Sequence, residues 1–243
     1  MQVDSSDNPT PVELSATASP SVPWPGRLLL LTLNLIPALH LLAITLILLK
    51  STATWPWRIA AALSLLYIAP PLAARLVLAF APVSQGRIAT GSRAFFSWWA
   101  AFQLQVLFCR LIFLEELVRL MPGLYSAWLR LWGARIGRLT YWSPGVVITD
   151  RSFLRIGDDV VLAAGVRLNA HVLARNAAGE VELLLADVTI GDRAIIGGYS
   201  LLTAGTVIAP DEATRAFLTS PPFSVWQNGK RARNAEPEAA DHE

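Results

Sequence analysis

The sequence predicts a chain with transmembrane α-helices in its N-terminal part and an all-β parallel β-helix in its C-terminal part. Two patterns support this fold class. Two apolar stretches of about twenty residues, the length that crosses a bilayer, occur before residue 82, and a six-residue beat of apolar residues begins after Pro122. Composition agrees, because 53% of the 243 residues are hydrophobic and 16% are charged. Part of this apolar surface is expected to face lipid.

Composition also excludes several classes of function. The net charge is only +2, the basic residues form no stripe, and no known nucleic-acid-binding motif is present, so we expect no nucleic-acid partner. A single cysteine, Cys109, excludes an internal disulfide and a metal site built from cysteines. Because Cys109 lies in a Leu- and Phe-rich segment, we interpret it as an inert buried thiol.

The first membrane helix is predicted at residues 28–49, after a Ser-, Thr- and Pro-rich segment, 1–26, that we expect to be a disordered tail. The stretch carries no charge, is flanked by Arg27 and Lys50, and would span roughly 33 Å as a helix. A signal peptide is the alternative, but the apolar run is too long and no clear cleavage site follows. Asn34 and His40 within it are expected to bond to a neighbouring helix rather than to a substrate.

A second span is predicted at residues 59–81, with a kink at Pro70 and Pro71. Arg75 lies close enough to its end to reach the headgroups. The apolar segment 94–120 is interrupted by polar residues, and we interpret it as an interfacial helix or a third span. The membrane region is therefore predicted to cover residues 27–121. Two spans would return the β-helix to the side of the N-terminus, whereas three would not.

The β-helix is predicted from internal repetition between residues 122 and 215. All ten slots of the six-residue beat are apolar, and at 53% apolar content chance gives this about once in five hundred. The slots are Ile136, Trp142, Ile148, Ile156, Leu162, Leu168, Ile190, Ile196, Leu202 and Ile208. The residue four positions after each of the first nine is small or β-branched, and each group of three opens with Ile-Gly.

This pattern is typical of a solenoid whose triangular coils each contain three short strands. About three coils are predicted, at 136–153, 156–173 and 190–207, with residues 216–243 left as a C-terminal tail. Trp142 is bulky for an inward position, and we expect it to cap the first coil. Residues 174–188 form an insertion between the second and third coils.

These residues resemble the [Leu/Ile/Val]-Gly-x-x-[small]-x repeat of the left-handed β-helix, hexapeptide-repeat acyltransferases. The resemblance covers roughly residues 125–215, in LRLWGARIG, LRIGDDVVLAAGVRLNAHVL and VTIGDRAIIGGYSLLTAGTVI. Within the family it is to membrane-associated members, including the terminal modules of peptide synthetases that make polylysine-like polymers. The left-handed coil is implied by the resemblance alone, since general topology favours right-handed crossovers.

His171 is the candidate catalytic base. Histidine suits the role because its ordinary pKa lies near neutral pH, and the other two histidines lie in the first span (His40) and in the tail (His242). By the resemblance, the base is a histidine on the coils beside a protruding loop, which is where His171 stands. Asp150 occupies the adjacent position on the neighbouring coil and is a candidate partner, although a solvated turn aspartate is an equal alternative.

Residues that contact the acyl donor are implied by the resemblance. Backbone amides at Gly197, Gly198 and Ser200 could face the thioester, Gly205 could let the carrier arm approach, and Asn169 could be polar lining of a groove. For the glycines, corner geometry alone is the alternative. The donor expected is acyl-CoA or acetyl-CoA, with an acyl carrier protein as the alternative, and no metal is expected.

The sequence therefore predicts a membrane-anchored acyltransferase that acts on a hydroxyl or amine of a lipid-, polysaccharide- or peptide-linked acceptor. We expect it in the bacterial inner membrane with the β-helix on the cytoplasmic side, in contact with membrane lipid. The resemblance implies a homotrimer, with a monomer as the alternative. A γ-class carbonic anhydrase needs three zinc-binding histidines, which this domain lacks. A non-catalytic scaffold in a membrane-associated biosynthetic complex is the alternative from another class.

Overall fold

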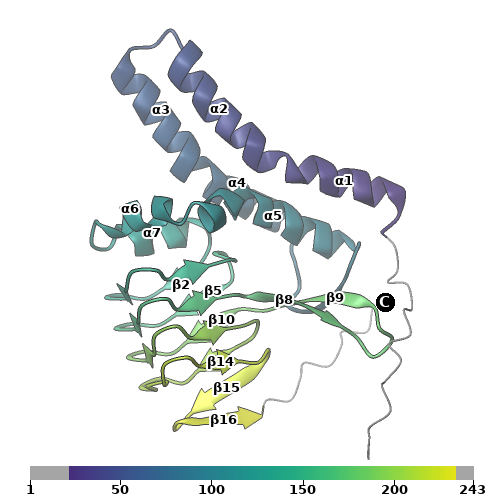
Figure 1. Cartoon of the computed structure of the whole chain (residues 1–243), viewed down its shortest axis with the longest axis vertical. Coiled ribbons are helices and arrows are strands. Elements are labelled where there is room, and N and C mark those ends of the chain that lie inside the picture. The colour runs from purple at the N-terminus through teal and green to yellow at the C-terminus, as the bar shows by residue number, and fades with distance from the viewer. Residues whose placement is uncertain (1–21, 234–243) are drawn as a thin grey trace, which may run out of the picture.

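The computed structural model describes residues 22–233 and shows a helical region stacked on one end of a β-solenoid (Figure 1). The helices come first in the chain and the coils follow them, as the sequence predicts. The helices are α1 (Trp24–Asn34), α2 (Ile36–Lys50), α3 (Trp55–Tyr67), α4 (Ala69–Phe80), α5 (Arg93–Arg110), α6 (Phe113–Arg119) and α7 (Leu124–Leu131). Part of the predicted tail, residues 1–21, lies outside the described residues, while α1 already begins at Trp24.

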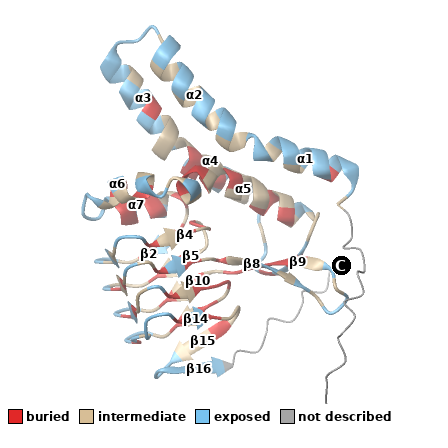
Figure 2. Cartoon of the chain, viewed as in Figure 1, coloured by how far each residue is buried: buried red, intermediate tan, exposed pale blue. Residues whose placement is uncertain are grey.

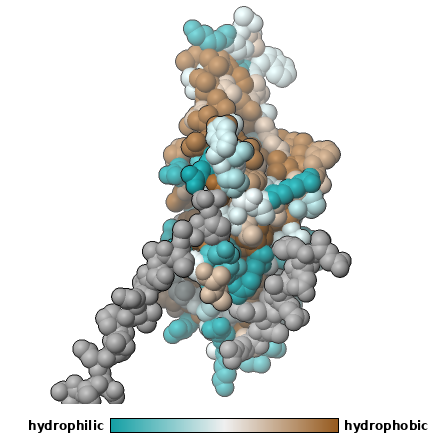
Figure 3. Space-filling model, turned by 90° about the vertical axis from the view of Figure 1, so that its right-hand side faces the viewer, coloured by the Kyte–Doolittle hydropathy of each residue, from teal (hydrophilic) through white to brown (hydrophobic). Residues whose placement is uncertain are grey.

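Two helical stretches within residues 22–233 are long and apolar enough to cross a membrane. They are Trp24–Lys50, which joins α1 to α2, and Trp55–Phe80, which joins α3 to α4. Their side chains are mostly exposed (Figure 2), and Figure 3 shows hydrophobic residues gathered on the surface of this part of the molecule. Exposed apolar surfaces of this size are typical of regions that bind another protein or a membrane.

The break between α3 and α4 falls where the two prolines predict a kink. Pro70 and Pro71 have no N–H to donate, so the carbonyls four residues before each of them, the second being that of Tyr67, lose their helical partners. His40 Nε2 bonds to the carbonyl oxygen of Leu65 at 2.9 Å, and Trp128 Nε1 donates to that of Tyr67 at 2.8 Å. The stretches Trp24–Lys50 and Trp55–Phe80 pack together through α2 and α3 as the two arms of a helical hairpin. His40 joins these hairpin arms, in agreement with the helix-to-helix role expected for it.

The solenoid is a parallel β-helix whose coils contribute strands to three sheets. The first coil contains β2 (Arg135–Ile136), β3 (Tyr141–Trp142) and β4 (Val147–Ile148), and the second contains β5 (Leu154–Ile156), β6 (Val161–Leu162) and β7 (Arg167–Leu168). The third contains β10 (Val188–Ile190), β11 (Ile195–Ile196) and β12 (Leu201–Leu202). Equivalent strands pair in parallel, as in Ile148 with Leu168 and Leu168 with Leu202.

The predicted inward positions are the core of the solenoid. Nine of the ten six-residue slots are buried, and the tenth, Trp142, is half-buried. Its indole N–H donates to the hydroxyl of Ser126 in α7 at 3.0 Å, so it closes the helical end of the first coil as expected. The glycine that follows the first slot of each coil allows the next coil to pack closely. In the third coil, a Cβ on Gly191 would lie 2.4 Å from the backbone N of Pro210.

The solenoid continues beyond residue 215, where the sequence analysis ended the domain. A fourth coil contains β13 (Val207–Ile208) and β14 (Thr219–Ser220). After it, β15 (Ser224–Gln227) pairs with β13 in parallel, and β16 (Lys230–Arg233) folds back antiparallel to β15. The predicted number of about three coils is therefore too low. Residues 216–233 of the predicted tail belong to the solenoid, and 234–243, with His242, lie outside the described residues.

The insertion after the second coil forms a hairpin of β8 (His171–Arg175) and β9 (Val181–Leu185). Strand β9 also pairs with β1 (Gly86–Ala89), which lies between α4 and α5. Arg87 forms an ion pair with Glu182, and the Thr90 hydroxyl donates to the carbonyl of Val181 at 2.6 Å. The insertion is therefore a fixed connection between the solenoid and the helical region (Figure 1).

Candidate active site

His171 stands where the chain leaves the second coil. It is the first residue of β8, three positions after the inward Leu168, and its side chain is 20% exposed. Helix α5 covers it on one side, where the rings of Trp98 and Phe102 approach the imidazole edge-on at 4.9 and 5.3 Å between centroids. The site is thus formed by the solenoid and the helical region together.

Asp150 is fully buried in the loop after β4 and contacts His171 directly. Its Oδ2 lies 2.6 Å from His171 Nδ1 and accepts a 2.8 Å hydrogen bond from the Thr149 hydroxyl. Its Oδ1 accepts a 3.0 Å hydrogen bond from the indole N–H of Trp98. The structure therefore brings the two predicted residues together and excludes the alternative of a solvated turn aspartate, because Asp150 has three donors and no contact with bulk water.

The two side chains shift each other's pKa in opposite directions. Burial alone would raise the pKa of Asp150, but the charge and hydrogen bond of His171, with those from Trp98 and Thr149, lower it overall. Burial would lower the pKa of His171, but the Asp150 carboxylate outweighs this and raises it above its ordinary 6.5. Asp150 therefore stays ionised and makes His171 a stronger base.

The second ring nitrogen of His171 is left available. The buried, ionised carboxylate can only accept, so Nδ1 carries the proton and Nε2 holds the lone pair in the neutral ring. Nε2 has no hydrogen-bond partner among residues 22–233. This arrangement gives a general base with a fixed tautomer.

A buried charged network next to Asp150 anchors its loop to the helical region. Arg151 is fully buried, and both its backbone N and its guanidinium donate to Gln105 Oε1 of α5, at 3.0 and 2.9 Å. Its guanidinium also forms an ion pair with buried Glu115 of α6. Glu115 accepts further bonds from Arg119, at 3.0 Å, and from the hydroxyl of Tyr125.

This network changes the interpretation of segment 94–120. The polar residues that suggested an interfacial helix include Gln103, Gln105 and Glu115, and all three are buried. Gln103 donates to Asn34 of α1 at 2.8 Å, and the other two bind Arg151. The polar side of the segment therefore faces the protein. Their position in an apolar segment was the signal for these contacts, but the sequence does not identify the partners.

The structure does not bring together all of the residues predicted to contact the acyl donor. Asn169 and Gly205 lie at the same corner of the solenoid as His171, after β7 and after β12. Gly197, Gly198 and Ser200 lie at a different corner, between β11 and β12. There Gly197 N donates to Thr214 Oγ1, and the buried Ser200 hydroxyl accepts from the backbone N of Leu218. Within one chain, these three serve coil packing.

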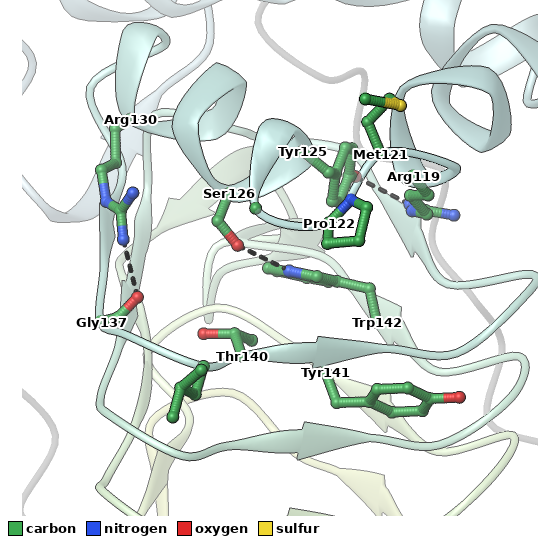
Figure 4. A pocket seen from close by; sticks show the side chains of 12 residues that line it. Arg119, Met121, Pro122, Tyr125, Ser126, Arg130, Gly137, Thr140, Tyr141 and Trp142 are labelled. Atoms are coloured by element: carbon green, nitrogen blue, oxygen red, sulfur yellow. Dashed lines mark hydrogen bonds between the residues drawn. The ribbon is translucent and has the colours of Figure 1, made fainter.

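A cavity of about 500 Å³ lies elsewhere, between α7 and the first coil (Figure 4). Trp142 and Tyr141 from β3 lie on one side of it, and Ser126 and Arg130 from α7 lie on the other. None of the predicted site residues lines it. Within residues 22–233, no group of three or more His, Cys, Asp or Glu side chains could hold a metal ion.

Comparisons with solved structures find similarity to hexapeptide-repeat acetyltransferases. A maltose O-acetyltransferase from Clostridium difficile shares 18% identity over 52% of this chain and 86% of its own, with a TM-score of 0.34. A Vibrio cholerae hexapeptide-repeat acetyltransferase in complex with acetyl-CoA shares 15% over 56% and 90%, with a TM-score of 0.35. Serine acetyltransferase isoform 3 from Entamoeba histolytica shares 14% over 88% and 97%, with a TM-score of 0.30. No family model and no curated protein matches the sequence.

Proposed function

We propose that this protein is a membrane-anchored acyltransferase that moves an acyl group from a thioester donor to a hydroxyl or amine. The observation that carries the proposal is the pair formed by buried, ionised Asp150 and His171, whose Nε2 has no hydrogen-bond partner in the described part of the chain. The hexapeptide repeat in the sequence supports the same assignment by resemblance. Acyl-CoA or acetyl-CoA is the proposed donor, and an acyl carrier protein is the second candidate.

The geometry supports a direct transfer. Nε2 of His171 accepts the proton of the acceptor O–H or N–H as the acceptor atom bonds to the thioester carbonyl carbon. The C–S bond then breaks, and the leaving thiolate takes the proton from Nε2 and departs as a thiol. Asp150 holds Nδ1–H and stabilises the imidazolium that exists between these two proton transfers.

A non-catalytic scaffold does not account for the site. Burying a carboxylate costs free energy that His171, Trp98 and Thr149 must offset, and an apolar side chain at position 150 would avoid this cost. The pair is also poorly placed for a purely structural role, because no residue between 22 and 233 bonds to Nε2 of His171. A base needs this arrangement, whereas a scaffold does not.

The proposed membrane anchor consists of the two hairpin arms, Trp24–Lys50 and Trp55–Phe80. The outer side of α6 and the start of α7 extends the exposed apolar surface, with Phe113, Leu117, Leu120, Met121 and Leu124. Leu117 and Leu124 line one apolar cavity of about 440 Å³ together with Leu63 of α3. We therefore place α6 and the start of α7 at the bilayer surface.

With two spans, the solenoid and the N-terminus share one side of the bacterial inner membrane, which we propose is the cytoplasmic side. The acyl donor would arrive from the cytoplasm, and the acceptor would be lipid-linked or directed to the surface. A homotrimer is the assembly that the resemblance implies.

The test is thiol release by the detergent-solubilised full chain, comparing wild type with His171→Ala and His171→Gln. Donors are a panel of acyl-CoAs and acyl carrier proteins, and acceptors are membrane-lipid and polysaccharide extracts. Loss of release in both variants, with unchanged thermal unfolding, supports the proposal. Equal release in wild type and variants removes His171 from the reaction, and no release from any donor favours the scaffold.

A further inference from the structure

Trp98 of the helical region touches both members of the proposed catalytic pair. It lies in α5, its side chain is 2% exposed, and its N–H donates to Asp150 Oδ1 at 3.0 Å. Its ring also packs edge-on against the His171 imidazole, with centroids 4.9 Å apart. No other bond to Oδ1 occurs within residues 22–233, whereas Oδ2 is held by both Thr149 and His171.

We propose that Trp98 is a positioning residue, which fixes the rotation of the Asp150 carboxylate so that Oδ2 faces Nδ1 of His171. This inference rests on the proposed function, because it concerns the same site. It makes the helical region part of the catalytic apparatus, in addition to its role as an anchor.

The chemistry of the indole suits this role. A carboxylate rotates easily about its last bond, so its orientation depends on what each oxygen meets. The indole N–H only donates, so it favours the ionised acid and cannot accept a proton from a protonated one. A hydroxyl, amide or water at the same place could bond to either form. Trp98 therefore selects one orientation and one ionisation state of Asp150, and through them the tautomer of His171.

The position of Trp98 is itself set by helix packing. Phe95 and Phe102 stand one turn away in α5, with ring centroids 5.8 and 5.4 Å from that of Trp98. Helix α5 in turn packs against α4, α1 and α2 of the proposed anchor. A shift of α5 away from the solenoid would withdraw the donor from Oδ1, so catalytic competence depends on the docking of α5.

Trp98→Phe tests the inference, because it removes the N–H and keeps an aromatic ring. The matched control is Trp99→Phe in the next residue, which loses a bond of the same 3.0 Å length to Asn34 Oδ1, away from the site. The first readout is the His171 pKa, from NMR titration of histidine-labelled full chain in detergent, with His171→Ala to assign the signal. This readout requires no substrate.

In Trp98→Phe we expect the His171 pKa to fall towards its ordinary 6.5 and kcat to fall about tenfold with KM for the donor unchanged. Trp99→Phe should change neither quantity. An unchanged His171 pKa and kcat in Trp98→Phe would overturn the inference, because a merely structural tryptophan moves neither.

Two further measurements keep the test decisive. If Trp98→Phe does not fold, benzothienylalanine at position 98 keeps the shape of the indole and lacks only the N–H, and the same pKa fall is expected. In an Asp150→Asn background, Trp98→Phe should leave the His171 pKa where it is, and a further fall there would contradict the mechanism. Full activity of His171→Ala would remove the proposed function but leave the pKa test of positioning intact.

Discussion

Asp150 controls the basicity of His171, and this gives the reaction a specific pH dependence. In the proposed mechanism the active base is neutral His171, so the rate should rise with pH through the raised pKa of this residue. Asp150→Asn removes the charge that raises that pKa, so the rising limb should move to lower pH. An amide also offers a donor where Trp98, Thr149 and His171 all need an acceptor, so the plateau rate should fall about a hundredfold or more.

The check is the pH profile of kcat/KM for thiol release. Asp158→Asn is the control, since Asp158 accepts from Arg138 at a different corner of the solenoid, and its profile should match wild type. A limb that moves to higher pH in Asp150→Asn, or does not move, would mean that Asp150 does not set the basicity of the catalytic group.

The two residues at the centre of the site could be predicted from sequence, but their surroundings could not. Stacked coils repeat at nearly constant intervals, so the repeat itself places position 150 near 171. Trp98 and Gln105 reach the same corner from a helix, 52 and 46 residues away from their partners. No periodicity relates an apolar helix to a coil, so these contacts depend on tertiary packing alone.

At the scale of elements, α5, α6 and α7 form a cap on the open end of the first coil. The buried pair of Arg151 and Glu115 holds the coil to the cap, and truncating one partner leaves the other as a buried, unpaired charge. We expect Glu115→Ala to lower the free energy of unfolding by about 3–5 kcal/mol, because Arg151 would then be buried without a carboxylate.

Chemical denaturation in detergent measures this effect. The control is Asp211→Asn, which breaks the exposed pair with Arg193 on the solenoid surface and should change little, since solvent screens exposed pairs. Similar losses in both variants would show that the cap contributes no more than a surface contact.

The fourth coil makes a second prediction at this scale. Leu218 is 2% exposed and its neighbour Phe217 is 71% exposed. Leu218→Ala should destabilise the chain by about 2–5 kcal/mol by leaving a cavity in the core, and Phe217→Ala should cost much less. Thermal unfolding of both variants compares them directly. If Leu218→Ala unfolds at the same temperature as wild type, the coil beyond residue 215 is not part of the cooperative core.

The fourth coil does not continue the six-residue apolar pattern, because residues with hydroxyl groups stand at positions where the earlier coils have apolar residues. Ser220 pairs in register with Leu202 of the coil before it, and it is fully buried. Its hydroxyl bonds to those of Thr206, at 2.7 Å, and Ser224, at 2.6 Å. A pattern based on apolar residues finds coils held by hydrophobic packing and stops where a hydrogen-bonded ladder takes over. The first three coils were therefore predictable, and the fourth was not.

At the scale of the whole molecule, the proposed position of the site relative to a bilayer rests on which surfaces are apolar. The hairpin arms and the outer side of α6 are apolar and exposed, while the coils below expose charged and polar side chains (Figure 3). His171 is the first residue of β8, and its ring packs against Trp98 of α5, so it lies between these two regions. An acceptor held in the membrane surface could therefore reach Nε2 while the donor remains in water.

The depth of three positions in the bilayer tests this arrangement. Leu42, Leu120 and Phe217 are all exposed, and each is changed to Cys in a Cys109→Ala background, given a fluorescent label and placed in nanodiscs. Doxyl lipids labelled in the acyl chain should quench position 42, those labelled near the headgroup should quench position 120, and neither should quench position 217, which only water-soluble iodide reaches. If iodide alone quenches position 42, the hairpin does not enter the membrane and the proposed anchor is wrong.

A mixed result would have a different meaning. If lipid quenches position 42 while only iodide quenches position 120, the proposed anchor holds but α6 lies away from the bilayer surface. His171 would then need an acceptor that leaves the bilayer to reach it.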